Sequence, residues 1–150
     1  MTTRTLLLAF HIACVCAWLG ANVVQLVLTP RFAKEAPDVA VSWTKAQMWL
    51  GQRYYSAVGA LIAVSGVLLV WHGHWPWSSG FIWVGVAVIV IGAGLGVAAF
   101  TPVMERRVAA LGSGDQAGAA QTLSRVIPLA LLDSAFVLLA ILAMVHKWHS

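Results

Sequence analysis

Hydrophobic residues along the chain gather in four long stretches, which are separated by segments richer in polar residues. The stretches cover residues 6–28, 55–71, 81–100 and 126–145. Each is close to the roughly 20 residues that a helix needs to cross a hydrocarbon core about 30 Å thick. Because lipid offers no partner to an open backbone N–H or C=O group, each stretch is predicted to be helical. The pattern predicts an all-α fold, a bundle of four transmembrane helices that forms a single integral membrane domain over residues 1–150.

The connections before the second and fourth stretches are predicted to contain helix as well. Pro37 and Asp38 form a helix-start signal, after which apolar residues recur at helical spacing. Residues 112–115 carry a turn and an N-cap signal, and residues 116–125 then lead helically into the fourth stretch. The second and fourth helices are therefore expected to begin well before the membrane.

The two halves of the chain follow the same order of segments. Thr29-Pro30 is expected to end the first span and Thr101-Pro102 the third. Each pair is followed by a basic segment, a helical lead-in, an apolar span and an ending rich in His and Trp. This order suggests a duplicated helical hairpin with a pseudo-twofold axis along the membrane normal. Chance resemblance between two apolar hairpins is the alternative, and the sequence leaves both open.

The overall composition agrees with a membrane environment and argues against several functional classes. Hydrophobic residues make up 61% of the chain and charged residues only 9%, whereas soluble domains carry about 25% charged residues. The net charge of +4 is too small and too dispersed for a nucleic-acid-binding surface. The chain has no HExxH motif, and its glycine-rich run over residues 92–96 lies inside an apolar stretch, where no phosphate-binding loop is expected. We expect a lipid bilayer around the chain and no nucleic-acid partner.

Basic residues predict the orientation of the helices. Seven of the nine Lys and Arg residues lie in the segments after the first and third stretches or at the start of the next stretch: Arg31, Lys34, Lys45, Arg53, Arg106, Arg107 and Arg125. By the positive-inside rule this side is cytoplasmic, so both termini and the loop over residues 72–80 are expected outside the cytoplasm, in a bacterial inner membrane. The first stretch follows Arg4 as a signal peptide would, but it is longer and contains polar residues, so we expect it to be retained.

One face of the first stretch carries polar side chains. At about 100° per residue, a single side of the helix presents His11, Cys14, Trp18, Asn22, Gln25 and Thr29. Because polar groups are costly when they face lipid, this side is predicted to point into the bundle or toward a partner chain. Hydrogen bonding between helices, without any chemistry, is the simpler explanation for Asn22 and Gln25.

Asp133 is the only acidic residue within a predicted span. A bare carboxylate near the bilayer centre costs about 2.5 to 3.5 kcal/mol on the insertion scale, so this group is expected to be paired, protonated or exposed to water. Counting residues along the helices places it at the depth of Asn22. A contact with Asn22 or Gln25 is predicted, with Arg53 or Arg125 as the alternative ionic partner. A proton relay or a coupling carboxylate is the functional counterpart.

All five histidines fall on the predicted outer side, where three segments converge. They are His11, His72, His74, His146 and His149, and Cys14 lies one helical turn from His11. Histidine is a common ligand of haem iron and copper, which predicts haem b or copper as cofactor. His11, His72 and His146 are the predicted cofactor ligands, with Cys14, His74 and His149 as further metal ligands. The alternative is that these histidines, together with Trp residues, populate the membrane interface.

The run from His11 to Gly20, HIACVCAWLG, resembles the opening of small bacterial membrane proteins of the uncharacterised DUF2269 type. It is also similar to the copper-resistance D domain. Ser65-Gly66 in the second stretch and the late helix ending near Lys147 fit the first of these groups, so the resemblance extends over most of the chain. These resemblances imply a bundle that handles haem or copper on its outer side.

A local resemblance connects the first helix with the four-helix protoporphyrinogen oxidases of the haem pathway. The matching positions are His11, Trp18 and Pro30-Arg31. That family implies an essential lysine in a later span, and this chain has no lysine between residues 45 and 147. Whether the chain is an enzyme is therefore left open.

Three functions follow from these observations. The first is a redox or metal-handling protein with His11 as inner ligand. The second is a non-catalytic accessory subunit whose polar face docks on another membrane protein, or on a second copy of the chain. The third is a small transporter that uses Asp133 as its coupling carboxylate.

Overall fold

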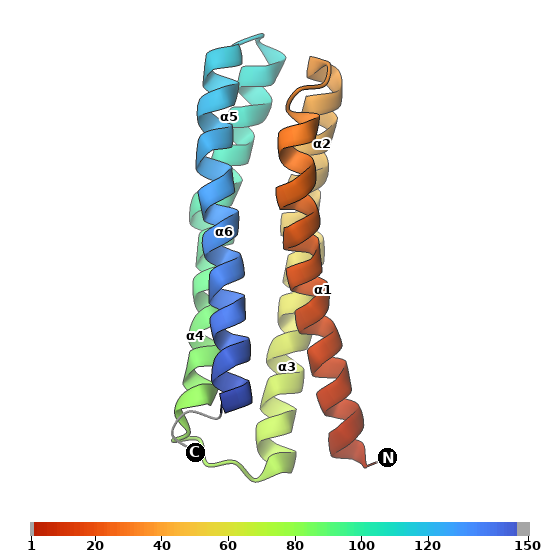
Figure 1. Ribbon diagram of the computed structural model, residues 1–150, viewed down its shortest axis with the longest axis vertical. Coiled ribbons are helices and arrows are strands. Elements are labelled where there is room, and N and C mark those ends of the chain that lie inside the picture. The colour runs from red at the N-terminus through yellow and green to blue at the C-terminus, as the bar shows by residue number, and fades with distance from the viewer. Residues whose placement is uncertain (1, 147–150) are drawn as a thin grey trace.

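The computed structural model describes residues 2–146, and the regular structure in this range is entirely helical (Figure 1). In chain order the elements are α1 (Thr3–Phe32), α2 (Pro37–Trp49), η1 (Leu50–Tyr55), α3 (Ser56–Gly73), α4 (Gly80–Leu95), η2 (Gly96–Phe100), α5 (Thr101–Gly112) and α6 (Gln116–His146). The segments η1 and η2 are π-helical turns that continue their flanking α-helices without a break. The described residues thus form four long helices, each apolar and long enough to cross a membrane, which confirms the predicted bundle.

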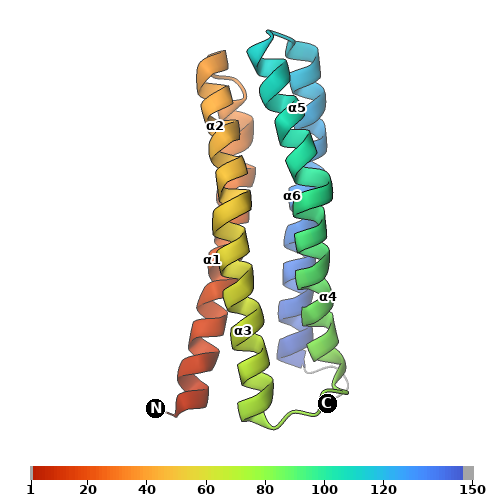
Figure 2. The same cartoon turned by 180° about the vertical axis from the view of Figure 1, so that it is seen from behind.

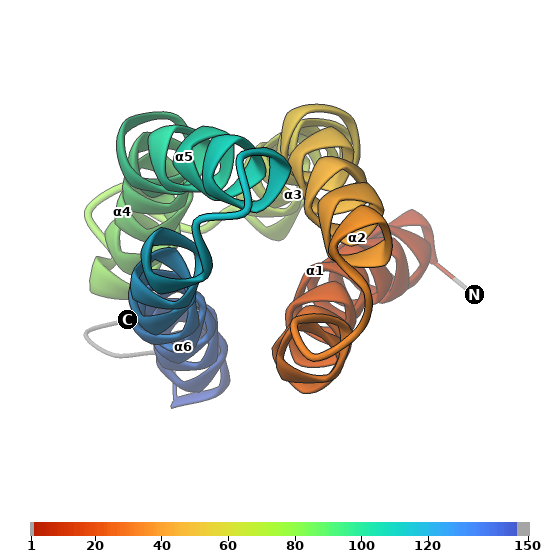
Figure 3. The ribbon, with the colours of Figure 1, turned by 90° about the horizontal axis from the view of Figure 1, so that it is seen from above.

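The four helices are arranged as two hairpins that lie side by side (Figures 1 and 2). In the first hairpin α1 packs against α3, and in the second α6 packs against α4 and α5. Contacts of α1 with α6, α3 with α4, and α2 with α5 join the hairpins. Viewed from above, the hairpins form two neighbouring helix pairs, with α5 of the second beside α2 of the first (Figure 3). The start of α1, the end of α6 and the α3–α4 connection share one end of the bundle, as the predicted topology requires (Figure 1).

The helices extend well past the predicted apolar spans. The second helix runs over 37 residues, Pro37–Gly73, or about 55 Å at the usual rise of about 1.5 Å per residue. The helical lead-ins are confirmed, because α2 begins at Pro37 and α6 at Gln116. Since a hydrocarbon core is only about 30 Å thick, the end of the bundle that carries the basic residues continues beyond it.

The helices continue past the two Thr-Pro pairs that are expected to end the first and third membrane spans. α1 continues through Pro30 to Phe32, and the third helix continues from η2 through Pro102 to Gly112. A proline is tolerated inside a membrane helix when nearby groups satisfy the backbone carbonyls around it. Just before Pro102, the backbone N–H and the hydroxyl group of Thr101 both donate to the carbonyl of Gly96, the hydroxyl at 2.9 Å.

The duplicated hairpin stays a prediction. Both hairpins contain one π-helical segment, but η1 lies in the second helix of its hairpin and η2 in the first helix of the other. A pseudo-twofold axis that superimposes the hairpins would therefore not superimpose these segments.

Within α1, the residues buried by the other helices lie on its polar side. The apolar outer surface stays exposed within the bundle, because lipid is expected to cover it. The buried residues of α1 are His11, Cys14, Asn22 and Thr29, and all four belong to the predicted polar face. Large apolar side chains such as Val97 and Val145 are 77% exposed within the bundle. The prediction that the polar face of the first helix points inward is confirmed.

A small cluster of buried apolar residues stabilises the end of the bundle where α2, α5 and the start of α6 meet. Ala40, Leu111 and Ala119 form this core. Next to it, the buried guanidinium group of Arg107 donates from Nη1 to the carbonyl of Ala119 at 2.9 Å. This bond ties α5 to α6 where the two hairpins also meet through α2 and α5.

Candidate functional site

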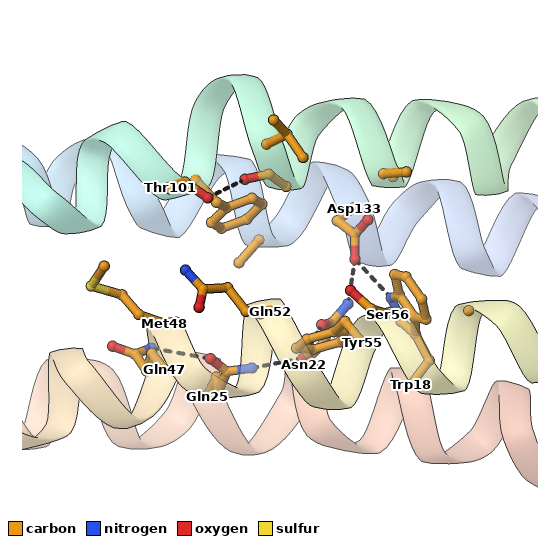
Figure 4. Close-up of a pocket in the computed structure, with 18 of the residues that line it drawn as sticks. Trp18, Asn22, Gln25, Gln47, Met48, Gln52, Tyr55, Ser56, Thr101 and Asp133 are labelled. Carbon is orange, nitrogen blue, oxygen red and sulfur yellow. Dashed lines mark hydrogen bonds between the residues drawn. The ribbon is translucent and has the colours of Figure 1, made fainter.

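A cavity of about 530 Å³ lies between the two hairpins, in the central part of the bundle (Figure 4). This volume falls within the range of about 300 to 1,000 Å³ that is usual for small-molecule sites. The first hairpin lines it from α1, α2, η1 and α3, and the second from α4, η2, α5 and α6. Both π-helical segments therefore contribute to its wall, and such segments are frequent at functional sites.

The two walls of the cavity differ in chemistry. The first hairpin contributes the polar and aromatic side chains Trp18, Asn22, Gln25, Thr29, Gln47, Gln52, Tyr55 and Ser56. The second hairpin contributes mainly apolar ones, among them Ile89, Val97, Phe100, Val126, Ile127 and Ala130. Asp133 also belongs to the second hairpin, and it is the only charged residue among those that line the cavity.

The carboxylate of Asp133 is held by two neutral donors from α1. Asn22 donates from Nδ2 to Oδ2 at 2.7 Å, and Trp18 donates from Nε1 to the same oxygen at 3.0 Å. Residues 18 and 22 are four apart, so the two side chains project from the same face of the helix. Asp133 is only 7% exposed. The predicted contact with Asn22 is confirmed.

The alternative partners predicted for Asp133 lie elsewhere. Gln25 does not contact the carboxylate and instead donates to the hydroxyl group of Tyr55 at 2.6 Å. Neither Arg53 nor Arg125 lines the cavity. The carboxyl group therefore accepts hydrogen bonds from neutral groups, and within residues 2–146 no Lys or Arg side chain lines the cavity beside it.

A directional chain of hydrogen bonds ends at this carboxylate. Gln47 donates to Gln25 at 3.3 Å, Gln25 to Tyr55 at 2.6 Å, and Tyr55 to the Oδ1 atom of Asn22 at 2.6 Å. Asn22 then donates to Asp133. Because every bond points the same way, each donor is polarised by the next, and the chain orients neutral dipoles toward the negative charge.

Glycines allow the indole ring of Trp18 to lie between the hairpins. A Cβ atom at Gly59 of α3 would lie 3.0 Å from the ring, and one at Gly92 of α4 would lie 3.7 Å from it. The same atom at Gly92 would lie 3.3 Å from Oδ1 of Asp133. Small residues at these two positions therefore make room for the donor and for the carboxylate.

The mouth of the cavity lies on the side formed by η1 and the first half of α3 in one hairpin and by the end of α4 and η2 in the other. The exposed residues among those that line the cavity all lie there: Gly51, Gln52, Ser56, Ala60, Ala93 and Val97. Val97 is 77% exposed and apolar, so the mouth adjoins the surface that lipid is expected to cover.

His11 is engaged between α1 and α3, outside this cavity. It is buried, and its Nδ1 atom lies 2.8 Å from the hydroxyl group of Ser65. That hydroxyl group donates to the carbonyl of Leu61 at 2.6 Å, which leaves it as the acceptor for a proton on Nδ1. Cys14 is buried one turn away, and neither residue lines the cavity.

The other predicted ligands lie at the end of the bundle where α3 and α6 finish. His72 and His74 are exposed near the end of α3, and His146 is exposed at the end of α6. His149 lies outside the described residues. Within residues 2–146 no group of three or more His, Cys, Asp or Glu side chains is placed to hold a metal ion. The haem and copper sites stay predictions.

Several residues of the site were not identified from the sequence. Trp18 was placed on the polar face but not as a donor to Asp133, and no role was assigned to Tyr55, Gln47 or Gln52. A tyrosine and glutamines just before an apolar span were a usable signal, because polar groups at this depth require partners.

No protein-family model, curated protein or solved structure matches this chain. The resemblance to DUF2269-type proteins, the copper-resistance D domain and the protoporphyrinogen oxidases stays a prediction. The function is therefore argued from the cavity itself.

Proposed function

We propose that the protein is a small membrane transporter that binds organic cations in the cavity and uses Asp133 as their charge partner. The observation that carries this proposal is the lone carboxylate, since every other residue lining the cavity is uncharged. A carboxylate in surroundings of low dielectric attracts a cation more strongly than the same group does in water. Ionisable residues inside membrane helices are rare and commonly mark substrate or ion pathways.

The lining of the cavity favours an organic cation over a metal ion. A hard cation such as Ca²⁺ takes about six to eight oxygen ligands, whereas this cavity offers one carboxylate with an oxygen already hydrogen-bonded. The wall formed by Phe100, Val126 and Ile127 suits an apolar body. The rings of Trp18 and Tyr55 are arranged edge to face, with their centroids 4.9 Å apart. They add aromatic faces that attract cations.

The mouth of the cavity provides the entry route in this proposal. An amphipathic cation dissolves in the membrane with its apolar part among the lipid tails, and Val97 lies on that side of the mouth. We place the basic end of the bundle on the cytoplasmic side of a bacterial inner membrane, as the positive-inside rule predicts.

Coupling to protons follows from the single negative charge. Asp133 holds either one cation or one proton, so release of the cation accompanies protonation of the carboxylate. Such an exchange keeps the charge in the cavity constant. The side chains of Trp18 and Asn22 orient the carboxylate through their hydrogen bonds, and the proton reaches it through the cavity.

Equilibrium binding of tetraphenylphosphonium to the purified protein in lipid nanodiscs tests this proposal. The wild type is expected to bind the probe, and Asp133→Asn, which keeps the side-chain shape but removes the charge, to lose at least tenfold in affinity. Asp38→Asn is the matched control, because Asp38 is exposed in the first turn of α2 and does not line the cavity. Equal binding by the wild type and Asp133→Asn would overturn the proposal.

The haem or copper function has less support from the cavity, since no histidine within residues 2–146 lines it. A visible absorbance spectrum of the purified protein, oxidised and then reduced with dithionite, separates the two functions. A Soret band lost in His11→Ala would establish haem binding, whereas a flat spectrum would contradict it. The accessory-subunit function predicts co-purification with one defined membrane protein, and a homodimer predicts a dimeric mass in native mass spectra.

A further inference from the structure

The two oxygens of the Asp133 carboxylate have different surroundings. Trp18 and Asn22 both donate to Oδ2, at 3.0 Å and 2.7 Å, and Figure 4 shows the two bonds meeting at one oxygen. Oδ1 accepts no hydrogen bond from a described residue. Because Asp133 is only 7% exposed, a buried carboxylate retains one oxygen without a protein partner.

Oδ1 is open to the cavity rather than sealed inside the protein. Among the described residues, the side-chain nitrogen and oxygen atoms that are both unpaired and closed off from solvent belong to Gln47, Ser79 and Arg107. Asp133 lines the cavity, as does Gly92, where a Cβ atom would lie 3.3 Å from Oδ1. An ionised carboxylate oxygen only accepts hydrogen bonds, and a buried one is unfavourable without a donor. A donor in the cavity is in a position to supply that bond.

The hydrogen-bond chain uses the other acceptors close to the charge. Oδ1 of Asn22 accepts from Tyr55, and the hydroxyl oxygen of Tyr55 accepts from Gln25. Oε1 of Gln25 accepts in turn from Gln47. The direction of the chain is set at its end, where the amide of Asn22 donates to the carboxylate. Oδ1 of Asp133 is therefore the acceptor beside these groups that stays free for a ligand.

We propose that Oδ1 of Asp133 accepts a hydrogen bond from an N–H group of the substrate, so that protonated amines are preferred to quaternary ammonium and phosphonium ions. The inference rests on the proposed function, because it requires the cation to lie at Asp133. An N–H group brings the nitrogen to about 2.8 Å from the oxygen. Methyl groups hold a quaternary nitrogen further away, which weakens the attraction. A site that bonds an N–H group discriminates against an analogue without one, because its own acceptor is then left unpaired.

A matched pair of probes tests the inference. Dimethylphenethylammonium carries one N–H group, and trimethylphenethylammonium carries a methyl group in its place. The two share the aromatic group, and both are positively charged at neutral pH. Affinities are measured by titration calorimetry for the full chain in lipid nanodiscs, with empty nanodiscs alongside to subtract binding to the lipid.

The wild type is expected to bind the dimethyl probe about tenfold more tightly than the trimethyl probe, as a hydrogen bond to a charged group contributes. Asp133→Asn is expected to bind both weakly and without this preference. Trp18 and Asn22 both donate to the Oδ2 position, so the amide oxygen of the variant occupies it and the NH₂ group, which cannot accept, replaces Oδ1.

A second variant keeps the charge and changes only the space beside Oδ1. Gly92→Ala brings a Cβ atom to 3.3 Å from this oxygen, and it is expected to lose more affinity for the dimethyl probe than for the trimethyl probe. Gly94→Ala is the matched control on the same helix, because Gly94 does not line the cavity and a Cβ atom there meets nothing within 4 Å. It is expected to keep the tenfold preference of the wild type.

The outcomes separate this inference from the proposed function. If Asp133→Asn binds both probes as the wild type does, or if the wild type binds neither, both fail. If binding requires Asp133 but the wild type binds the two probes equally, the inference about Oδ1 alone is overturned. It is also overturned if Asp133→Asn or Gly92→Ala retains the full preference for the dimethyl probe.

Discussion

The hydrogen bond between Asn22 and Asp133 is expected to hold the two hairpins together. The bond spans 2.7 Å between α1 and α6, and both side chains are only 7% exposed. Replacing Asn22 by Leu removes the bond and leaves the carboxylate with Trp18 as its remaining donor. We expect a marked loss of stability, because a buried charge that loses a partner costs more than the bond itself contributes.

The size of the effect can be bounded from the geometry. Hydrogen bonds to charged groups contribute about 1.5 to 3 kcal/mol, whereas interhelical side-chain bonds in a membrane average about 0.6 kcal/mol and reach about 1.7. The Asn22 bond is short, buried and made to a carboxylate, so its coupling energy is expected at the upper end of the membrane range, about 1.5 kcal/mol.

A double-mutant cycle measures this coupling energy. Asn22→Leu, Asp133→Leu and the double variant are unfolded in mixed detergent micelles, and the free energy of unfolding of each is compared with that of the wild type. Asn22→Leu is expected to lower the free energy of unfolding much more in the protein that retains Asp133 than in the Asp133→Leu variant. Additive effects, with a coupling energy below about 0.5 kcal/mol, would refute the reasoning.

Two further predictions concern the space around Asp133 and its charge. Gly92→Ala is expected to destabilise the protein by about 1 kcal/mol and to weaken tetraphenylphosphonium binding, because the new Cβ atom would lie 3.3 Å from Oδ1. Gly94→Ala is the control, because a Cβ atom there meets nothing within 4 Å, and it is expected to leave the free energy of unfolding unchanged or to raise it. Equal losses of unfolding free energy and of probe affinity in the two variants would contradict this prediction. Asp133→Glu, which keeps the charge, is expected to retain binding of the permanently charged probe, and a loss as large as that in Asp133→Asn would contradict the role of the charge.

The fold could be predicted from the sequence because lipid leaves the chain few choices. Four apolar stretches of spanning length must be helical, and polar side chains spaced by three and four residues on the first of them must face inward. The contact between Asn22 and Asp133 followed from counting residues to equal depth. The helices run through the Thr-Pro pairs at residues 29–30 and 101–102, because a proline is tolerated inside a membrane helix.

The cavity could not be predicted, because spacing within one helix does not fix its rotation against the others. The ring of Trp18 lies against Gly59 of another helix, where a Cβ atom would come within 3.0 Å of it. Tyr55 and Gln52 line the cavity together from η1, a π-helical segment that no sequence pattern indicated. The histidines could be grouped only by the side of the membrane on which they are predicted to lie. That grouping does not determine which side chains are neighbours, so it could not show that His11 bonds to Ser65 rather than lying beside His72.

Flux of an organic cation across a membrane tests the central claim most directly. Proteoliposomes loaded with benzyltrimethylammonium, a poorly permeant aromatic cation, are given an inward proton gradient, and release of the cation is followed for the wild type, Asp133→Asn and protein-free liposomes. The account predicts release by the wild type and release at the protein-free level by Asp133→Asn. Release by Asp133→Asn as fast as by the wild type, or wild-type release at the protein-free level, would contradict it.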